Sequence, residues 1–251
     1  MKYATIAILL LFLLSTNHVT GEDHLPAQDT LPKVGTIIYL FPGQGADYRQ
    51  YREIEFPAGY DTVRISYPVP EKRENMREFA LRFVPLIDQD APFVLMGVSL
   101  GGMICTELAD TLKAERVILI SSAKSYKELP GRYNFSKRVA VNRIVPKGLT
   151  KAGARMLQGI VEPDRRYDKE TFKDMLKRKD ACYLKRTVDM IVHWERTEHH
   201  PAIVHIHGDA DHTIPVKHVN YDYLVEEGSH MMVLTRAGEI SGIIREILEA
   251  R

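Results

Sequence analysis

Short apolar runs that alternate with segments of helical periodicity constrain this chain most. The runs cover residues 35–41, 62–66, 93–98, 116–120, 203–207 and 221–225, and the helical segments cover residues 74–90, 102–113 and 235–249. This alternation favours βαβ units, and continuous apolar runs are typical of parallel strands covered on both faces. With 251 residues, 45% of them hydrophobic, the chain can build one full core. The pattern predicts an α/β fold with a mainly parallel, six-stranded, doubly wound sheet.

The alternation stops between residues 124 and 200, where only helical patterns and loops are visible. Asp168 begins one helical pattern as an N-cap, and Leu184, Val188, Ile191 and Glu195 form the stripe of a second. We expect an inserted helical lid whose apolar faces line a pocket, and we expect Trp194 to pack in its core. Lys and Arg outnumber Asp and Glu there by about two to one. The excess fits either solvated helix faces or contact with an anionic surface.

The N-terminus has the features of an export signal. Lys2 is followed by an apolar run over residues 4–14 and by small residues at 19–21. We expect residues 1–21 to be a signal peptide and residues 22–251 to be the exported domain, periplasmic or secreted. The run is shorter than the roughly 20 residues of a membrane-spanning helix, so a membrane anchor is the alternative.

A serine lies between an apolar run and a helical segment in the sequence GVSLGG, residues 97–102. A sharp turn from strand to helix there exposes Ser99 as a nucleophile and needs the small residues Gly97, Gly101 and Gly102 around it. The Leu100 amide at the helix start can then stabilise an oxyanion. A glycine-rich turn with an incidental serine is the alternative.

Candidate partners of this serine follow the last two predicted strands. Asp209 and Asp211 come after residues 203–207, and His230 comes after residues 221–225. Ligands of open α/β sheets bind beyond the carboxyl ends of the strands, which is where all these residues are expected. A nucleophilic serine needs a base and the base needs an orienting acid, so the set is suited to acyl transfer.

From Val34 onward the chain resembles the α/β-hydrolase family, in which the nucleophile, the acid and the histidine follow in this order. The resemblance implies Ser99 as nucleophile and His230 as base. The family pattern G-x-x-D-x-x-x-P selects Asp211, with Asp209 as the second candidate. The family usually has His-Gly before its second oxyanion donor; here the sequence is FPGQG, residues 41–45, so the resemblance implies the Gln44 amide as donor.

Other interpretations of the same residues are weaker. The segments FPGQG and GVSLG also resemble acyl-carrier-protein transacylases, although Val98 replaces their histidine. His205 and His207 share one face of a predicted strand, but no H-E-x-x-H spacing occurs, so we expect no metal and no cofactor. Cys105 is expected to be a buried thiol, although one bridge to Cys182 would be allowed after export.

These features together predict a serine hydrolase that cleaves a carboxylic ester, or a related thioester or amide, through an acyl-enzyme. The substrate is expected to be a small acyl compound with an apolar portion. No basic run interleaved with aromatic residues indicates a nucleic-acid partner. An acyltransferase and a non-catalytic ligand-binding protein of the same fold are the alternative functions, and the oligomeric state is left open.

Overall fold

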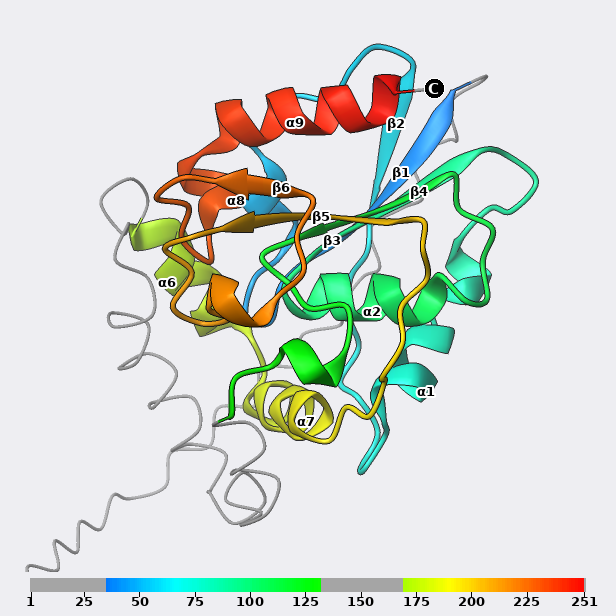
Figure 1. Ribbon diagram of the computed structural model, residues 1–251. Coiled ribbons are helices and arrows are strands. Elements are labelled where there is room, and N and C mark those ends of the chain that lie inside the picture. Colours follow the sequence, from blue (N-terminus) through cyan, green and yellow to red (C-terminus); the bar gives the residue numbers. More distant parts are fainter. Residues whose placement is uncertain (1–34, 132–168, 251) are drawn as a thin grey trace, which may run out of the picture. The chain divides into compact units, whose positions relative to one another are not determined.

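Six parallel strands form a single sheet in the computed structural model, which describes residues 35–131 and 169–250 (Figure 1). The strand order is β2-β1-β3-β4-β5-β6. Their bounds are β1 Thr36–Phe41, β2 Tyr60–Arg64, β3 Phe93–Val98, β4 Arg116–Ile120, β5 Ile203–Gly208 and β6 Tyr223–Val225. The expected parallel, six-stranded α/β fold is therefore confirmed, with the second strand beginning two residues earlier than predicted.

Helices cover both faces of this sheet (Figure 1). The helices are α1 Met76–Leu81, α2 Leu100–Leu108, α6 Lys169–Arg178, α7 Ala181–Val192, α8 Met232–Thr235 and α9 Ala237–Glu249, with 3-10 turns η1 Tyr48–Tyr51, η2 Val84–Leu86, η3 Tyr126–Glu128 and η4 Val216–His218. Alternate β1 residues enter different cores: Tyr39 packs with α1, α2 and the end of α7, whereas Ile38 packs with α8 and α9. The sheet is doubly wound, as predicted.

Helix α9 shows how the periodicity of the sequence produces this packing. Ile240, Ile244 and Ile247 lie three or four residues apart and are almost fully buried against the sheet. Burying each such side chain stabilises the fold by about 1.5–3 kcal/mol. The stripe therefore fixes which face of α9 meets the strands.

Three predicted helices have different bounds in the structure. Residues 74–90 form α1 and the short turn η2, because Pro85 lacks an amide hydrogen and restricts the residue before it. The helix expected over 102–113 begins at Leu100 and ends at Leu108. The helix expected over 235–249 is confirmed as α9, which begins at Ala237, and a separate short helix, α8, precedes it.

The predicted lid is described only in part. The described residues 169–200 form the helices α6 and α7 and no strand, as the periodicity predicts. Glu195, the last residue of the predicted stripe, lies beyond the end of α7. Trp194 is buried in the core that includes α2, and its Nε1 donates to Glu107 at 2.7 Å. The predicted signal peptide, Asp168 and residues 132–168 lie outside the described residues. Within the described ranges, no helix is long and apolar enough to cross a membrane.

Candidate active site

Ser99 lies on the turn between β3 and α2, in a strained backbone conformation. Its φ is 53° and its ψ is −118°, a region that residues with a side chain rarely adopt. Neighbouring backbone passes close on both sides: a Cβ on Gly97 would overlap Gly101, and a Cβ on Gly101 would overlap the Phe41 carbonyl. A Cβ on Gly102 would likewise overlap the Ser122 side chain. The three glycines therefore allow a turn that leaves Ser99 only half buried.

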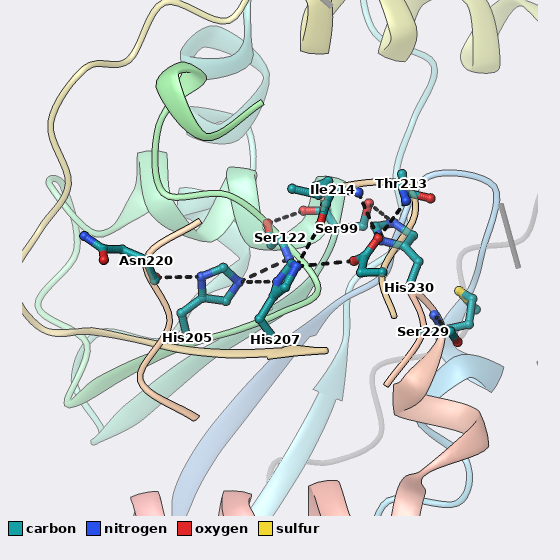
Figure 2. Close-up of polar contacts among 11 residues, drawn as sticks. Ser99, Ser122, His205, His207, Thr213, Ile214, Asn220, Ser229 and His230 are labelled. Carbon is teal, nitrogen blue, oxygen red and sulfur yellow. Dashed lines mark hydrogen bonds and ion pairs between the residues drawn. The ribbon is translucent and has the colours of Figure 1, made fainter. Parts of the chain in front are cut away.

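Ser99, His230 and Asp211 form one hydrogen-bonded chain. The Ser99 Oγ is 2.9 Å from His230 Nε2 (Figure 2), and His230 Nδ1 is 2.8 Å from Asp211 Oδ2. The residues come from the ends of β3, β5 and β6, which lie at the same edge of the sheet. The structure thus brings together the three residues that the sequence proposes as nucleophile, base and acid. In this geometry His230 can accept the serine proton while Asp211 fixes its orientation.

The acid position distinguishes between Asp211 and Asp209. Asp211 is buried, and its Oδ1 accepts from the Thr213 and Ile214 amides, each at 2.8 Å. Burial alone would raise the pKa of Asp211, but His230, His207 and the Ile214 amide outweigh burial and lower it. Asp209 is exposed and lies outside this hydrogen-bonded chain. Asp211 therefore remains a carboxylate beside His230.

The loop after β1 holds the Gln44 amide near the nucleophile. Tyr51 and Tyr67 donate through their hydroxyls to the Phe41 and Pro42 carbonyls at 2.9 and 2.8 Å. Gln50 Oε1 accepts from the Gly43 amide at 3.2 Å, and a Cβ on Gly43 would lie 3.5 Å from Ser99 Cβ. These bonds fix the loop on every side.

The amides of Gln44 and Leu100 are available as hydrogen-bond donors to a substrate. The Gln44 N–H donates to no acceptor among the described residues. Leu100 is the first residue of α2, and the first amides of a helix have no partner within it. Both are the amides that the sequence proposes as oxyanion donors, and such donors act where negative charge develops during acyl transfer.

The Gln44 side chain joins this loop to α7. Its Nε2 donates to Thr187 Oγ1 at 2.7 Å and to the Leu184 carbonyl at 3.2 Å. Arg49, in η1, makes a second link by pairing with Asp174 of α6 at 2.8 Å. The two helices are therefore tied to the loop that carries the Gln44 amide, a connection that the sequence analysis missed because the partners are more than 120 residues apart.

An apolar cluster lies next to this loop. Ala46, Met175 and Met231 pack together, and Met231 directly follows His230. Leu176 of α6 is close to Gly45, since a Cβ there would lie 3.2 Å from its Cδ1. Apolar side chains therefore pack beside the loop that follows β1.

The cysteines and histidines outside the chain of three do not form a metal centre in the described ranges. No group of three or more His, Cys, Asp or Glu residues is placed there to hold an ion. Cys105 is buried and free, as expected, and Cys182 is also free, so the allowed bridge is absent. Burial raises the pKa of the Cys105 thiol well above its usual range, which makes it a poor nucleophile.

His205 and His207 lie directly behind Asp211. Both are fully buried, and their rings contact each other at 3.2 Å between His207 Nδ1 and His205 Nε2 (Figure 2). The sequence places them on one face of a strand but gives them no role. One feature of the sequence could have indicated a role. Residues two apart on a strand point to the same face, and His207 is close to the end of the strand that the candidate acid follows.

Comparisons with known proteins agree with this architecture. The family model described as "Alpha/beta hydrolase family" matches residues 18–241. No sequence among curated proteins matches the chain. Several solved structures share the fold at low sequence identity.

Three of these structures illustrate the range. A hydrolase from Pseudomonas aeruginosa PA01 has a TM-score of 0.65 at 18% identity and covers 87% of this chain and 92% of its own. An enol-lactonase from Burkholderia xenovorans LB400 has a TM-score of 0.64 at 15% identity, with 86% and 92% covered. An esterase from Exiguobacterium antarcticum has a TM-score of 0.66 at 14% identity, again with 86% and 92% covered. At such identities the likeness establishes the fold and leaves the substrate open.

Proposed function

The chain belongs to the alpha/beta hydrolase family and is therefore a hydrolase, and from this premise we propose that it cleaves carboxylic esters, or related acyl bonds, through Ser99 and an acyl-enzyme. The observation that carries the proposal is the chain of contacts from Ser99 Oγ to His230 at 2.9 Å and from His230 to Asp211 at 2.8 Å. Distances of this kind allow proton transfer between nucleophile and base.

The reaction follows from these positions. His230 Nε2 takes the Ser99 proton as Oγ attacks the substrate carbonyl carbon, and the Gln44 and Leu100 amides stabilise the oxyanion that forms. The oxyanion then collapses and breaks the bond to the alcohol, which leaves with the proton from His230. Water attacks the acyl-enzyme with His230 again as base, and this step releases the acid and restores Ser99.

The substrate is proposed to have an apolar acyl or alcohol group. The support is the apolar cluster of Ala46, Met175 and Met231, which includes the residue that directly follows His230. Apolar surface of this kind favours a hydrophobic group by about 0.8 kcal/mol for each methylene it buries.

A panel of substrates tests the proposal. Esters, thioesters and anilides of acyl chains from two to twelve carbons would be offered to the wild-type protein and to Ser99→Ala. We expect ester hydrolysis whose kcat/KM rises with chain length, and a loss of at least about 10⁴-fold in Ser99→Ala. The thermal midpoints of the two proteins would be compared as a control for folding. Equal rates in both proteins, or no acyl hydrolysis by the wild type, would contradict the proposal.

A further inference from the structure

A buried belt of polar groups lies behind the candidate acid and nucleophile. It consists of His207, His205 and Ser122, which belong to β5 and to the turn after β4 (Figure 2). The two imidazole rings are completely buried and meet at an interplanar angle of 79°. None of these groups takes part in the proposed reaction itself.

The hydrogen-bond partners of the two rings determine which ring nitrogens carry a hydrogen. His207 Nε2 lies 2.8 Å from the Ile214 carbonyl, and His205 Nδ1 lies 3.1 Å from the Asn220 carbonyl. A carbonyl oxygen only accepts hydrogen bonds, so each of these nitrogens must carry a hydrogen. His205 Nε2, in turn, accepts from the Ser122 amide at 3.3 Å. His207 is therefore a donor toward Ile214. In neutral rings the facing nitrogens, His207 Nδ1 and His205 Nε2, then carry no hydrogen, so their 3.2 Å separation is a packing contact between the rings.

This donor closes the turn that carries Asp211. The Ile214 amide donates to Asp211 Oδ1 at 2.8 Å, while the Ile214 carbonyl accepts from His207. Ile214 is thus held from both sides, and His207 Nε2 is itself 3.6 Å from Asp211 Oδ2, the oxygen that meets His230. His207 therefore contacts both Ile214 and Asp211 without belonging to the hydrogen-bonded chain of Ser99, His230 and Asp211.

The other end of the belt reaches the nucleophile. Ser122 Oγ donates to the Ser99 carbonyl at 2.7 Å, and the Ser122 amide donates to His205. The turn of Ser99 is therefore hydrogen-bonded to His205, whose ring packs against His207 beside the turn of Asp211. A shift at His207 reaches the acid through two hydrogen bonds, one to the Ile214 carbonyl and one from the Ile214 amide.

The electrostatic surroundings keep both rings neutral at ordinary pH. Burial lowers the pKa of His207, and although Asp211 and the Ile214 carbonyl oppose this, they do not outweigh it. Burial lowers the pKa of His205 much further, helped by His207 and Lys124. Lys124 is paired with Asp222 at 3.3 Å, and Asp222 also accepts from the His205 amide.

We propose that His207, packed against the His205 ring, is a positioning residue that sets the Asp211 carboxylate against His230. The inference rests on the proposed function, because it assigns Asp211 the role of orienting acid. It adds a residue whose effect on turnover is exerted wholly through another. Misplacing a catalytic group by about 1 Å can lower a rate by about 100-fold, which sets the expected size of the effect.

Two substitutions separate the donor from the ring. In His207→Gln the amide nitrogen can occupy the place of Nε2 and still donate to Ile214, whereas in His207→Asn the amide lies near the place of Nδ1 and cannot reach it. We expect His207→Asn to lower kcat by about 10- to 100-fold with little change in KM. We expect His207→Gln to restore kcat to within about threefold of wild type. His218→Gln, on the exposed turn η4, is the matched control and should behave as wild type.

The pH profile distinguishes positioning from simple loss of stability. If Asp211 moves away from His230 in His207→Asn, the imidazolium of His230 loses stabilisation, so the acid limb of kcat/KM should move to lower pH. In His207→Gln the limb should stay in place. An unchanged limb in folded His207→Asn, or equal losses of kcat in both variants that follow their thermal midpoints, would overturn the proposal.

A measurement on the wild-type protein tests the same contact without any turnover. Nitrogen-15 NMR distinguishes a protonated imidazole nitrogen from a bare one, and we expect a protonated Nε2 on His207. A bare Nε2 would overturn the proposal whether or not the variants fold. If the wild type hydrolyses no acyl substrate, the proposed function fails, while this spectrum and the variant spectra still report whether His207 holds the turn of Asp211.

Discussion

Two carboxylates on the turn after β5, Asp209 and Asp211, are separated by a single residue but lie in opposite environments. Asp211 is buried, accepts two amides of its own turn and meets His230, whereas Asp209 is exposed. A motif in the sequence favoured Asp211 without excluding Asp209. The distinction is physical: burial opposes the charge of Asp211, but His230 and buried amide donors outweigh it and lower its pKa, and Asp211 is the one of the two that contacts the base.

Substitution of each aspartate tests this distinction. In Asp211→Asn the amide cannot hold the reactive tautomer of His230, so we expect kcat to fall by about 10⁴-fold. Asp209→Asn makes the same chemical change on the exposed position and should leave kcat within about twofold. Steady-state kinetics on an active ester measures both. A large loss in Asp209→Asn with a small one in Asp211→Asn would reverse the assignment.

The role of His207 could not be predicted from the sequence around it. A buried histidine near the end of a strand has the same sequence context whether it fills space or braces a neighbouring turn. Its role depends on the Ile214 carbonyl, seven residues away, whose direction no side-chain pattern encodes. The glycines around Ser99 are the opposite case. Neighbouring atoms lie so close that only glycine fits there, and glycine can be recognised directly in the sequence.

At the level of elements, the loop after β1 and helix α7 act as one unit. The Gln44 side chain donates to Thr187 on α7, while the Gln44 amide donates to no acceptor among the described residues, and Gly43 before it lies against Ser99. The periodicity of the sequence predicts α7, and the FPGQG motif predicts the loop. Neither feature predicts that the two are in contact, because periodicity indicates the buried face of a helix but not which loop that face meets.

Removing the hydroxyl of Thr187 tests the link. Thr187→Val keeps the side-chain shape and removes the acceptor, which costs about 1 kcal/mol. If that energy positions the oxyanion donor, kcat should fall about fivefold with little change in KM. Gln44→Met retains the backbone amide and removes the other partner. Additive effects of the two substitutions in a double-mutant cycle would show that the contact contributes nothing to turnover.

For the molecule as a whole, the topology was the most predictable feature. Six strands with continuous apolar runs and connecting helices of 3.6-residue period leave few arrangements besides a parallel sheet covered on both sides. The carboxyl ends of β1, β3, β5 and β6 then supply Gln44, Ser99, Asp211 and His230 to one edge. Helix ends were less predictable, as Pro85 shows, because local breaks and tertiary packing decide them.

The central claim is that Ser99 is the nucleophile, and covalent labelling tests it most directly. The intact protein would be treated with a fluorophosphonate, weighed by mass spectrometry and digested to locate the adduct. We expect one adduct per chain, on Ser99, with none on Ser99→Ala, and slower labelling of Asp211→Asn because His230 is less well oriented. An adduct on another residue, or labelling of Ser99→Ala at the wild-type rate, would contradict the claim.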